Sequence, residues 1–177
     1  MTEKGGPYSC VETLKGGGKF TIRAVRADDG PKIRQVFYHL TPHTRYMRFL
    51  GRKEEISEAE LARITQADFK NSIALLATIS EGDKEIVIGG ASCYTINPAA
   101  AERSGEVAFT VEEEFQGRGV GGALMRHLAA ITRAKGFHSL WAEVLCCNAP
   151  MLDVFRRSGL PMKVERDGNV LQVALSL

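Results

Sequence analysis

The stretch VAFTVEEEFQGRGVGG (residues 107–122) joins an apolar strand to a helix through an acidic turn and a glycine-dense loop. Glycine lets the backbone approach a ligand closely, and the first N–H groups of a helix have no partner within the helix. With the positive end of the helix dipole, these groups form a binding site for phosphate. The stretch therefore predicts that a phosphate-bearing ligand binds where the helix begins.

Length and charge narrow the classes of protein to which the chain can belong. Its 177 residues predict one domain over 1–177. The 23 Lys and Arg residues nearly balance 21 Asp and Glu, and no basic stripe is present, which argues against a nucleic-acid partner. No apolar run approaches the roughly 20 residues that span a bilayer. The segment from Met1 to Pro7 lacks the apolar core of a signal peptide, so we expect no membrane association and a cytoplasmic location.

Neither the cysteines nor the histidines are spaced like metal ligands. Cysteines occur at positions 10, 93, 146 and 147 without a C-x-x-C pair, so we expect free structural thiols. His127 falls near an apolar helical stripe and is expected to be a packed residue, and His39, His43 and His138 show no metal spacing. We therefore expect no metal cofactor.

Periodicity and turn residues predict mostly strands with interspersed helices. A hairpin is expected from strands at 8–15 and 20–26, and helices are expected to begin at Asp28 and at Ser57, where Glu60 completes a capping box. The remaining strands are expected at 72–80, 85–95, 105–111, 139–145, 161–166 and 170–175. Two more helices are expected, from the glycine loop to Lys135 and over 150–158. This order predicts an α/β (α+β) sheet covered by helices.

The glycines also fit a dinucleotide-binding pattern as Gly117-x-Gly119-x-x-Gly122. In a Rossmann unit the first glycine follows the strand directly, whereas Glu112–Phe115 intervene here. Glu143 nevertheless lies at the end of the next strand, where a ribose-binding acid would sit, so this alternative stays open. No Lys-Ser or Lys-Thr follows the glycines, which excludes a P-loop.

The same residues, Gln116 to Gly121, match the Q/R-x-x-G-x-G/A motif of GCN5-related N-acetyltransferases (GNAT). The segment NAPML (148–152), followed by Gly159-Leu160, resembles a later segment of that family. The resemblance covers about residue 20 to the end and leaves 1–19 as an N-terminal strand or hairpin extension. It implies a mixed central sheet of about seven strands, with two parallel strands that splay apart, and about four helices.

A narrower resemblance concerns IRAVRADD (22–29) and TPHTRYMRF (41–49), which look like the acetyltransferase domain of bacterial protein lysine acetyltransferases. It implies transfer of an acetyl group from acetyl-CoA to a primary amine, with a protein lysine as acceptor, by direct attack in a ternary complex. A small amine, such as a polyamine, an aminoglycoside or an amino acid, is the first alternative acceptor. A non-catalytic acyl-CoA sensor is the second alternative. A homodimer is common in the family, although no residue demonstrates one here.

The resemblance also implies where acetyl-CoA binds. It would lie between strands 105–111 and 139–145, with its diphosphate on the backbone of the glycine loop. The Val111 N–H would hold the developing oxyanion, and Asn148 either contacts the CoA arm or caps a helix. The implied cofactor-binding residues are Phe109, Thr110, Val111, Gln116, Gly117, Arg118, Gly119, Val120, Gly121, Gly122 and Asn148.

Amine acetylation needs a neutral nitrogen, and only about one lysine in two thousand is neutral at pH 7. A general base relieves this shortage. Glu106 is the candidate base, because a carboxylate within a central strand is costly to bury without a task. Strand alternation places it on one face with Ala108 and Thr110. Glu143 is the second choice, and Glu112–Glu114 are expected to form a solvated turn.

The sequence does not single out one proton donor for the CoA thiolate. Many relatives carry a tyrosine where this chain has Phe155, which has no proton to give. Ser158, Tyr94 or water remain as donors, or the thiolate leaves unassisted. The basic and aromatic residues Arg45, Tyr46 and Arg48 either shape the acceptor pocket or belong to a surface helix.

Overall fold

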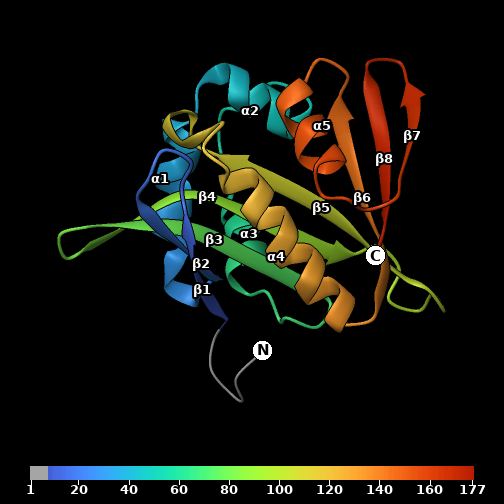
Figure 1. The fold of residues 1–177 in the computed structure, drawn as a ribbon, viewed down its shortest axis with the longest axis horizontal. Coiled ribbons are helices and arrows are strands. Elements are labelled where there is room, and N and C mark those ends of the chain that lie inside the picture. The colour runs from blue at the N-terminus through green and yellow to red at the C-terminus, as the bar shows by residue number, and fades with distance from the viewer. Residues whose placement is uncertain (1–7) are drawn as a thin grey trace.

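The computed structural model describes residues 8–177, in which eight strands form one mixed sheet (Figure 1). Its order is β1-β2-β3-β4-β5-β6-β8-β7. The strands are β1 (Ser9–Thr13), β2 (Lys19–Ala24), β3 (Ser72–Glu81), β4 (Lys84–Thr95), β5 (Arg103–Val111), β6 (Phe137–Leu145), β7 (Met162–Asp167) and β8 (Val170–Ser176). The α/β class is thereby confirmed. The β1–β2 hairpin joins the sheet edge, so the sheet has one strand more than the seven expected.

Five α-helices cover the sheet, one more than expected. They are α1 (Gly30–His39), α2 (Pro42–Phe49), α3 (Glu58–Thr65), α4 (Val120–Ala134) and α5 (Ala149–Arg156), with 3-10 turns η1 (Ala27–Asp29) and η2 (Glu113–Phe115). The additional helix is α2, whose first turn is capped by the Thr41 hydroxyl, which accepts from the Thr44 N–H at 3.2 Å. No helix among residues 8–177 is long and apolar enough to cross a membrane.

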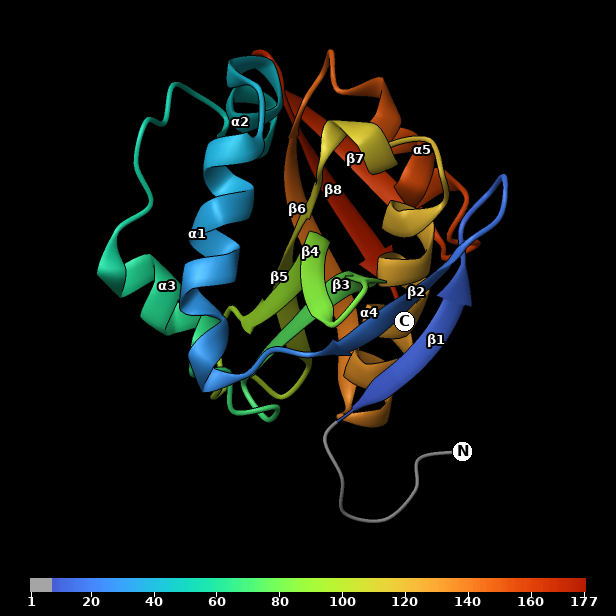
Figure 2. The same ribbon diagram turned by 90° about the vertical axis from the view of Figure 1, so that its left-hand side faces the viewer.

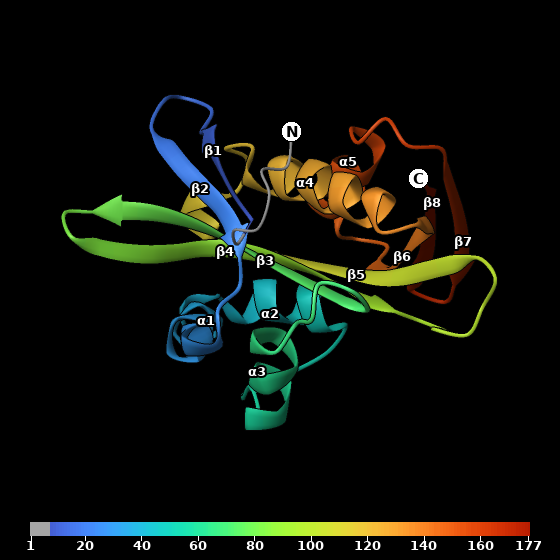
Figure 3. The same ribbon diagram turned by 90° about the horizontal axis from the view of Figure 1, so that it is seen from below.

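The helices divide between the two faces of the sheet. Seen edge-on, α4 and α5 lie on one face and α1, α2 and α3 lie on the other (Figures 2 and 3). The larger core lies beneath α4, where Leu124 and Leu128 are fully buried against strand residues such as Ile88. The smaller clusters on the opposite face centre on Val36 and Phe37 of α1. Along α4, Val120, Ala123, Leu124 and Leu128 are buried, whereas Ile131 is only partly buried.

The sheet opens between its two parallel strands. β5 and β6 pair only from Arg103 to Glu106 on β5, and the last pair is Glu106 with Trp141. Beyond that point β5 stays paired with β4 as far as Val111, and β6 stays paired with β8 as far as Leu145. The two strands therefore separate toward the end occupied by α2 and α5 (Figure 1), which confirms the expected splayed pair.

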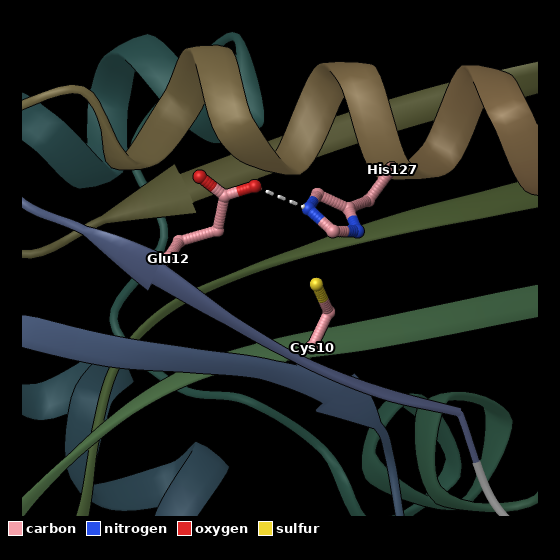
Figure 4. A group of neighbouring side chains, drawn as sticks. All are labelled: Cys10, Glu12 and His127. Atoms are coloured by element: carbon pink, nitrogen blue, oxygen red, sulfur yellow. Dashed lines mark hydrogen bonds and ion pairs between the residues drawn. The ribbon is translucent and has the colours of Figure 1, made fainter. Parts of the chain in front are cut away.

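The hairpin is held on α4 by side chains that point from β1 to His127 (Figure 4). The Glu12 carboxylate lies 2.8 Å from His127 Nε2, and the Tyr8 hydroxyl contacts its Nδ1. The His127 side chain is 10% exposed, so it is a packed residue, as expected. Cys10 Sγ lies within 4.8 Å of a carboxylate oxygen of Glu12 and of a ring nitrogen of His127.

The cysteines are free, but only one of them packs in the core. Cys93 is buried, and burial raises the pKa of its thiol to about 12. Cys10, Cys146 and Cys147 are exposed, so the expectation of structural thiols fails for these three. Cys10 lies in the edge strand β1, and Cys146 and Cys147 follow the end of β6. At these positions their side chains reach solvent and contribute nothing to the core.

A buried ion-pair network ties β2, η1 and β4 together. The Arg23 guanidinium donates two hydrogen bonds to Asp29, at 2.7 and 2.8 Å, and two to Glu85, at 2.8 and 2.7 Å. Arg23 is 3% exposed and Asp29 1%. Pairing lowers the pKa of Glu85 from 4.5 to about 2. The stability that this carboxylate contributes is therefore complete above pH 4.5 and is lost as the pH falls toward 2.

Asp29→Asn should lower the free energy of unfolding by about 3–5 kcal/mol, because it leaves the buried guanidinium without half of its partners. Glu58→Gln is the matched control, since Glu58 is 82% exposed in its pair with Arg34 and should change stability by less than about 1 kcal/mol. Urea unfolding followed by circular dichroism measures both. Equal effects of the two substitutions would contradict a stabilising role for the buried network.

Candidate active site

A cleft opens where β5 and β6 separate. It has a volume of about 90 Å³ and is lined by both strands, by α5 and by the end of α2. Glu106 and Phe109 line it from β5, Glu143 from β6, and Asn148 and Phe155 from the α5 segment. Glu106, the candidate base, therefore shares one cavity with Glu143, the second choice for that role. The predicted binding residues Phe109 and Asn148 line the same cavity.

Backbone groups of β5 face this cleft because β6 has moved away. The Glu112 N–H donates to the Ile88 carbonyl of β4 at 3.0 Å. Since backbone groups alternate sides along a strand, the N–H groups of Val111 and Phe109 point to the open side. Thr110 faces β4 opposite Gly90, and its side chain lines a different cavity. Of the three predicted β5 positions, Phe109 and Val111 therefore turn their backbone toward the open side, and Phe109 lines the cleft itself.

The glycine loop presents a row of N–H groups at the start of α4. Gly119 caps the helix with φ of +95°, and Gly117 has φ of +70°, conformations that side chains other than glycine rarely adopt. Within residues 8–177, no hydrogen bond is made by the N–H groups of Gly119, Val120, Gly121 or Gly122. Free N–H groups at the positive end of a helix dipole are the arrangement that an anion site requires, so the loop has the geometry on which the sequence prediction depends.

Two long-range contacts hold this loop in place. The Gln116 side chain donates from Nε2 to the Val111 carbonyl at 3.0 Å, which fastens the loop to the end of β5. The Lys15 N–H donates to the Arg118 carbonyl at 2.9 Å, and the Lys15 side chain lies over Gly119. Lys15 is a cation beside the anion site that sequence reasoning missed, because only the folded hairpin brings it there.

The acidic turn is not the solvated turn that we expected. The Glu113 carboxylate accepts from the Thr41 N–H at 2.9 Å and from its hydroxyl at 2.6 Å, at the start of α2. Glu112 lies 3.5 Å from the His39 ring at the end of α1. Two of the three glutamates thus join the glycine loop to the α1–α2 connection, a contact between segments about 70 residues apart.

Glu106 lies at the point where the strands separate, directly across from Tyr94 on β4. Its side chain is exposed, so the sequence argument from a buried carboxylate fails. The predicted alternation holds, because Val107 and Phe109 are buried on the α4 side. Glu106 is therefore open to an incoming molecule on the face opposite α4.

Comparisons with known proteins agree with this geometry. The family model described as the acetyltransferase (GNAT) family matches residues 37–160. An acetyltransferase of Pseudomonas aeruginosa is 35% identical over 144 residues, which are 81% of this chain and 76% of that protein. The chain belongs to the GNAT acetyltransferase family.

Solved structures show the same GNAT fold. The GNAT domain of S. lividans PAT is 29% identical, with a TM-score of 0.86 over 96% of this chain and 97% of that domain. The Salmonella typhimurium protein YncA, solved with its cofactor acetyl-CoA, is 18% identical. Its TM-score is 0.69, with coverage of 89% of this chain and 92% of that one.

The residues after β6 serve this GNAT chain structurally as well as lining the cleft. Asn148 caps α5, because its side-chain oxygen accepts from the Met151 N–H at 3.2 Å. Phe155 is 1% exposed and packs edge-on against Phe109. The Ser158 hydroxyl donates to the Phe155 carbonyl at 2.6 Å and does not line the cleft, which disfavours it as a proton donor.

A second cavity of about 180 Å³ lies on the opposite face of the sheet, between the strands and helices α1 and α3. Tyr94, Thr110 and Arg48 line it together with many apolar side chains. Of the three α2 residues singled out in the sequence, Arg48 lines both cavities, Arg45 lines neither and Tyr46 is exposed. The sequence left a pocket role and a surface helix open for all three, and the structure brings one of them to the cavities.

Gly119→Ala should lower the free energy of unfolding by about 1–2 kcal/mol, because φ of +95° strains any residue with a Cβ. Gly122→Ala is the matched control from the same turn, where an added Cβ meets nothing within 4 Å. It should raise stability by up to about 1 kcal/mol. Urea unfolding distinguishes them, and a loss of equal size in both would contradict the strained cap.

Proposed function

We propose that this protein uses acetyl-CoA to acetylate a primary amine, by direct attack in a ternary complex. The observation that supports the proposal is the placement of two groups along β5. Glu106 lines the cleft, and Gln116 fastens the glycine loop, whose N–H groups at residues 119–122 make no hydrogen bond among residues 8–177, to the end of the same strand. A row of free N–H groups beyond the end of the strand and a carboxylate within it suit a co-substrate with a diphosphate at one end and a reactive acyl group at the other.

The residues present fit acetyl-CoA along its length. The N–H groups from Gly119 to Gly122 would hold the diphosphate, with Lys15 adding a positive charge. The N–H groups of Phe109 and Val111 face the cleft, where they would bind amide carbonyls of the pantetheine arm and the thioester oxygen. Acetyl-CoA supplies the activated acetyl group, and donors fixed in the strand stabilise the oxyanion as it develops.

Glu106 is the proposed general base. An ammonium group must lose a proton before its nitrogen can attack, and a carboxylate at the mouth of the cleft can accept that proton directly or through water. No side chain that lines the cleft among residues 8–177 is a tyrosine. We therefore propose that water protonates the departing thiolate.

A protein lysine is the proposed acceptor, supported by the similarity to the GNAT domain of S. lividans PAT. A small amine is a second candidate, favoured by the cavity of about 180 Å³ that shares Arg48 and Ala108 with the cleft. A non-catalytic acyl-CoA sensor would bind the same co-substrate without turnover. The cytoplasmic location, the absence of a metal and the homodimer stay predictions.

Glu106→Gln should lower kcat at pH 7 by roughly 10²- to 10⁴-fold, because no base then removes the amine proton. The deficit should shrink as the pH rises toward about 10.4, where lysine loses its proton unaided. Initial rates of thiol release across pH measure this, and acetyl-CoA binding by calorimetry should stay unchanged. Glu143→Gln is the matched control, and a larger loss in that variant would transfer the role of base to Glu143.

Acetyl-CoA should raise the melting temperature, whereas NAD and NADP should not. A ligand that binds only the folded state stabilises it by about 2.7 kcal/mol at 100 times its Kd. Differential scanning fluorimetry with each ligand at matched concentration measures the shift. Stabilisation by NAD or NADP alone would instead support the dinucleotide alternative that the glycine spacing leaves open.

A further inference from the structure

Arg48 connects the two cavities. It projects from α2 and lines both the cleft that contains Glu106 and the cavity of about 180 Å³ between the sheet and helices α1 and α3. Ala108 is the other residue common to both, and it lies two positions after Glu106 on the same strand face. An amine that reaches Glu106 from this face therefore passes beside the Arg48 side chain.

The positive charge of Arg48 has no partner. Its Nε atom is shielded from solvent, and among residues 8–177 the guanidinium makes no hydrogen bond or ion pair. The guanidinium lies 4.8 Å from the centre of the Phe49 ring. Burial lowers the pKa of Arg48, but arginine stays charged at neutral pH.

The nearby carboxylates do not neutralise this charge. Glu60, which lines the larger cavity, is held by Lys53 at 2.7 Å and by the Ser57 N–H at 2.9 Å. Glu106 forms no hydrogen bond to Arg48. By contrast, the buried guanidinium of Arg23 donates hydrogen bonds to two carboxylates, those of Asp29 and Glu85. Glu106 and Glu60 attract the charge of Arg48 through space, but among residues 8–177 no carboxylate makes direct contact with its guanidinium.

A shielded guanidinium is costly unless an anion pairs with it, and its planar fork matches a carboxylate. We propose that Arg48 binds a carboxylate carried by the acceptor, close to the amine that is acetylated. This inference rests on the proposed function and names a substrate class for it, a primary amine with a neighbouring carboxylate. Arg48 is then a specificity-determining residue for the acceptor.

Two sources could supply this chemistry. In a protein acceptor, an aspartate or glutamate beside the target lysine would bind Arg48. In a free amino acid, the α-carboxylate would do so while its side chain enters the larger cavity, whose walls include Val36, Leu40 and Ile64. Both acceptors need a carboxylate close to the reacting amine. In the free amino acid it is a few bonds away, and in the protein it belongs to a neighbouring residue.

Paired acceptors test the proposal on the full-length chain with saturating acetyl-CoA. One pair is a lysine peptide flanked by glutamate and the same peptide flanked by glutamine. The other is leucine and isopentylamine, which lacks the carboxylate. For at least one pair we expect kcat/KM to favour the carboxylate by on the order of 10- to 100-fold, mainly through KM. The pair that shows the preference identifies the source.

Arg48→Gln should remove most of that preference, and Arg45→Gln should keep it. Arg45 is a matched control, since it lies on the same helix with a shielded, unpaired Nε but lines neither cavity. Acetyl-CoA binding by both variants reports that they fold. Equal rates for both members of each pair in the wild type would overturn the inference, even if Arg48→Gln does not fold.

Loss of the preference in Arg45→Gln to the same extent would also overturn it, because the effect would then come from the helix and not from Arg48. Failure of the wild type to acetylate any of the four acceptors, or a wider panel of amines, would instead refute the proposed function. Acetylation of neutral acceptors alone leaves the proposed function standing and removes this inference. The two hypotheses therefore fail in different ways.

Discussion

The rest of the structure depends on the place where β5 and β6 stop pairing, at Glu106 and Trp141. Each strand keeps its other neighbour, so the sheet can open without unravelling. The inner edges are left with backbone donors and acceptors that need partners, because unpaired buried peptide groups are unfavourable. A ligand with its own amide groups satisfies such an edge, whereas a purely apolar ligand does not. The opening therefore selects the kind of molecule that can bind.

Strand alternation places the side chains of β5 on two different faces of the sheet. Val107 and Phe109 are buried in the core beneath α4, and strand alternation places Glu106 and Ala108 on the opposite face, where Ala108 lines the larger cavity. The anion site is at the start of α4, and the second cavity is on the opposite face. A donor molecule and an acceptor molecule can thus approach one strand from opposite sides. This arrangement suits direct transfer, since neither molecule has to leave before the other binds.

Local signals explain which features could be predicted from the sequence. The capping box of Ser57 and Glu60, the glycine loop and the alternation of β5 depend on residues close together in the chain, and each is present. Features formed by distant segments could not be predicted in this way. The contact of Glu113 with Thr41 joins residues 72 positions apart, and Lys15 meets the glycine loop across more than 100. The residues around Glu113 do not indicate a contact with Thr41, and those around Lys15 do not indicate a contact with the glycine loop.

Arg23 and Arg48 show why a charge without a partner is informative. Arg23 is buried and makes hydrogen bonds to Asp29 and Glu85, whereas Arg48 is partly buried and its shielded Nε atom makes none. A fold that needed Arg48 only for packing would be as well served by an uncharged side chain of similar length, since desolvating an unpaired charge lowers stability. The charge is therefore expected to act in a state that the free protein does not show, when an anion occupies the adjoining cavity.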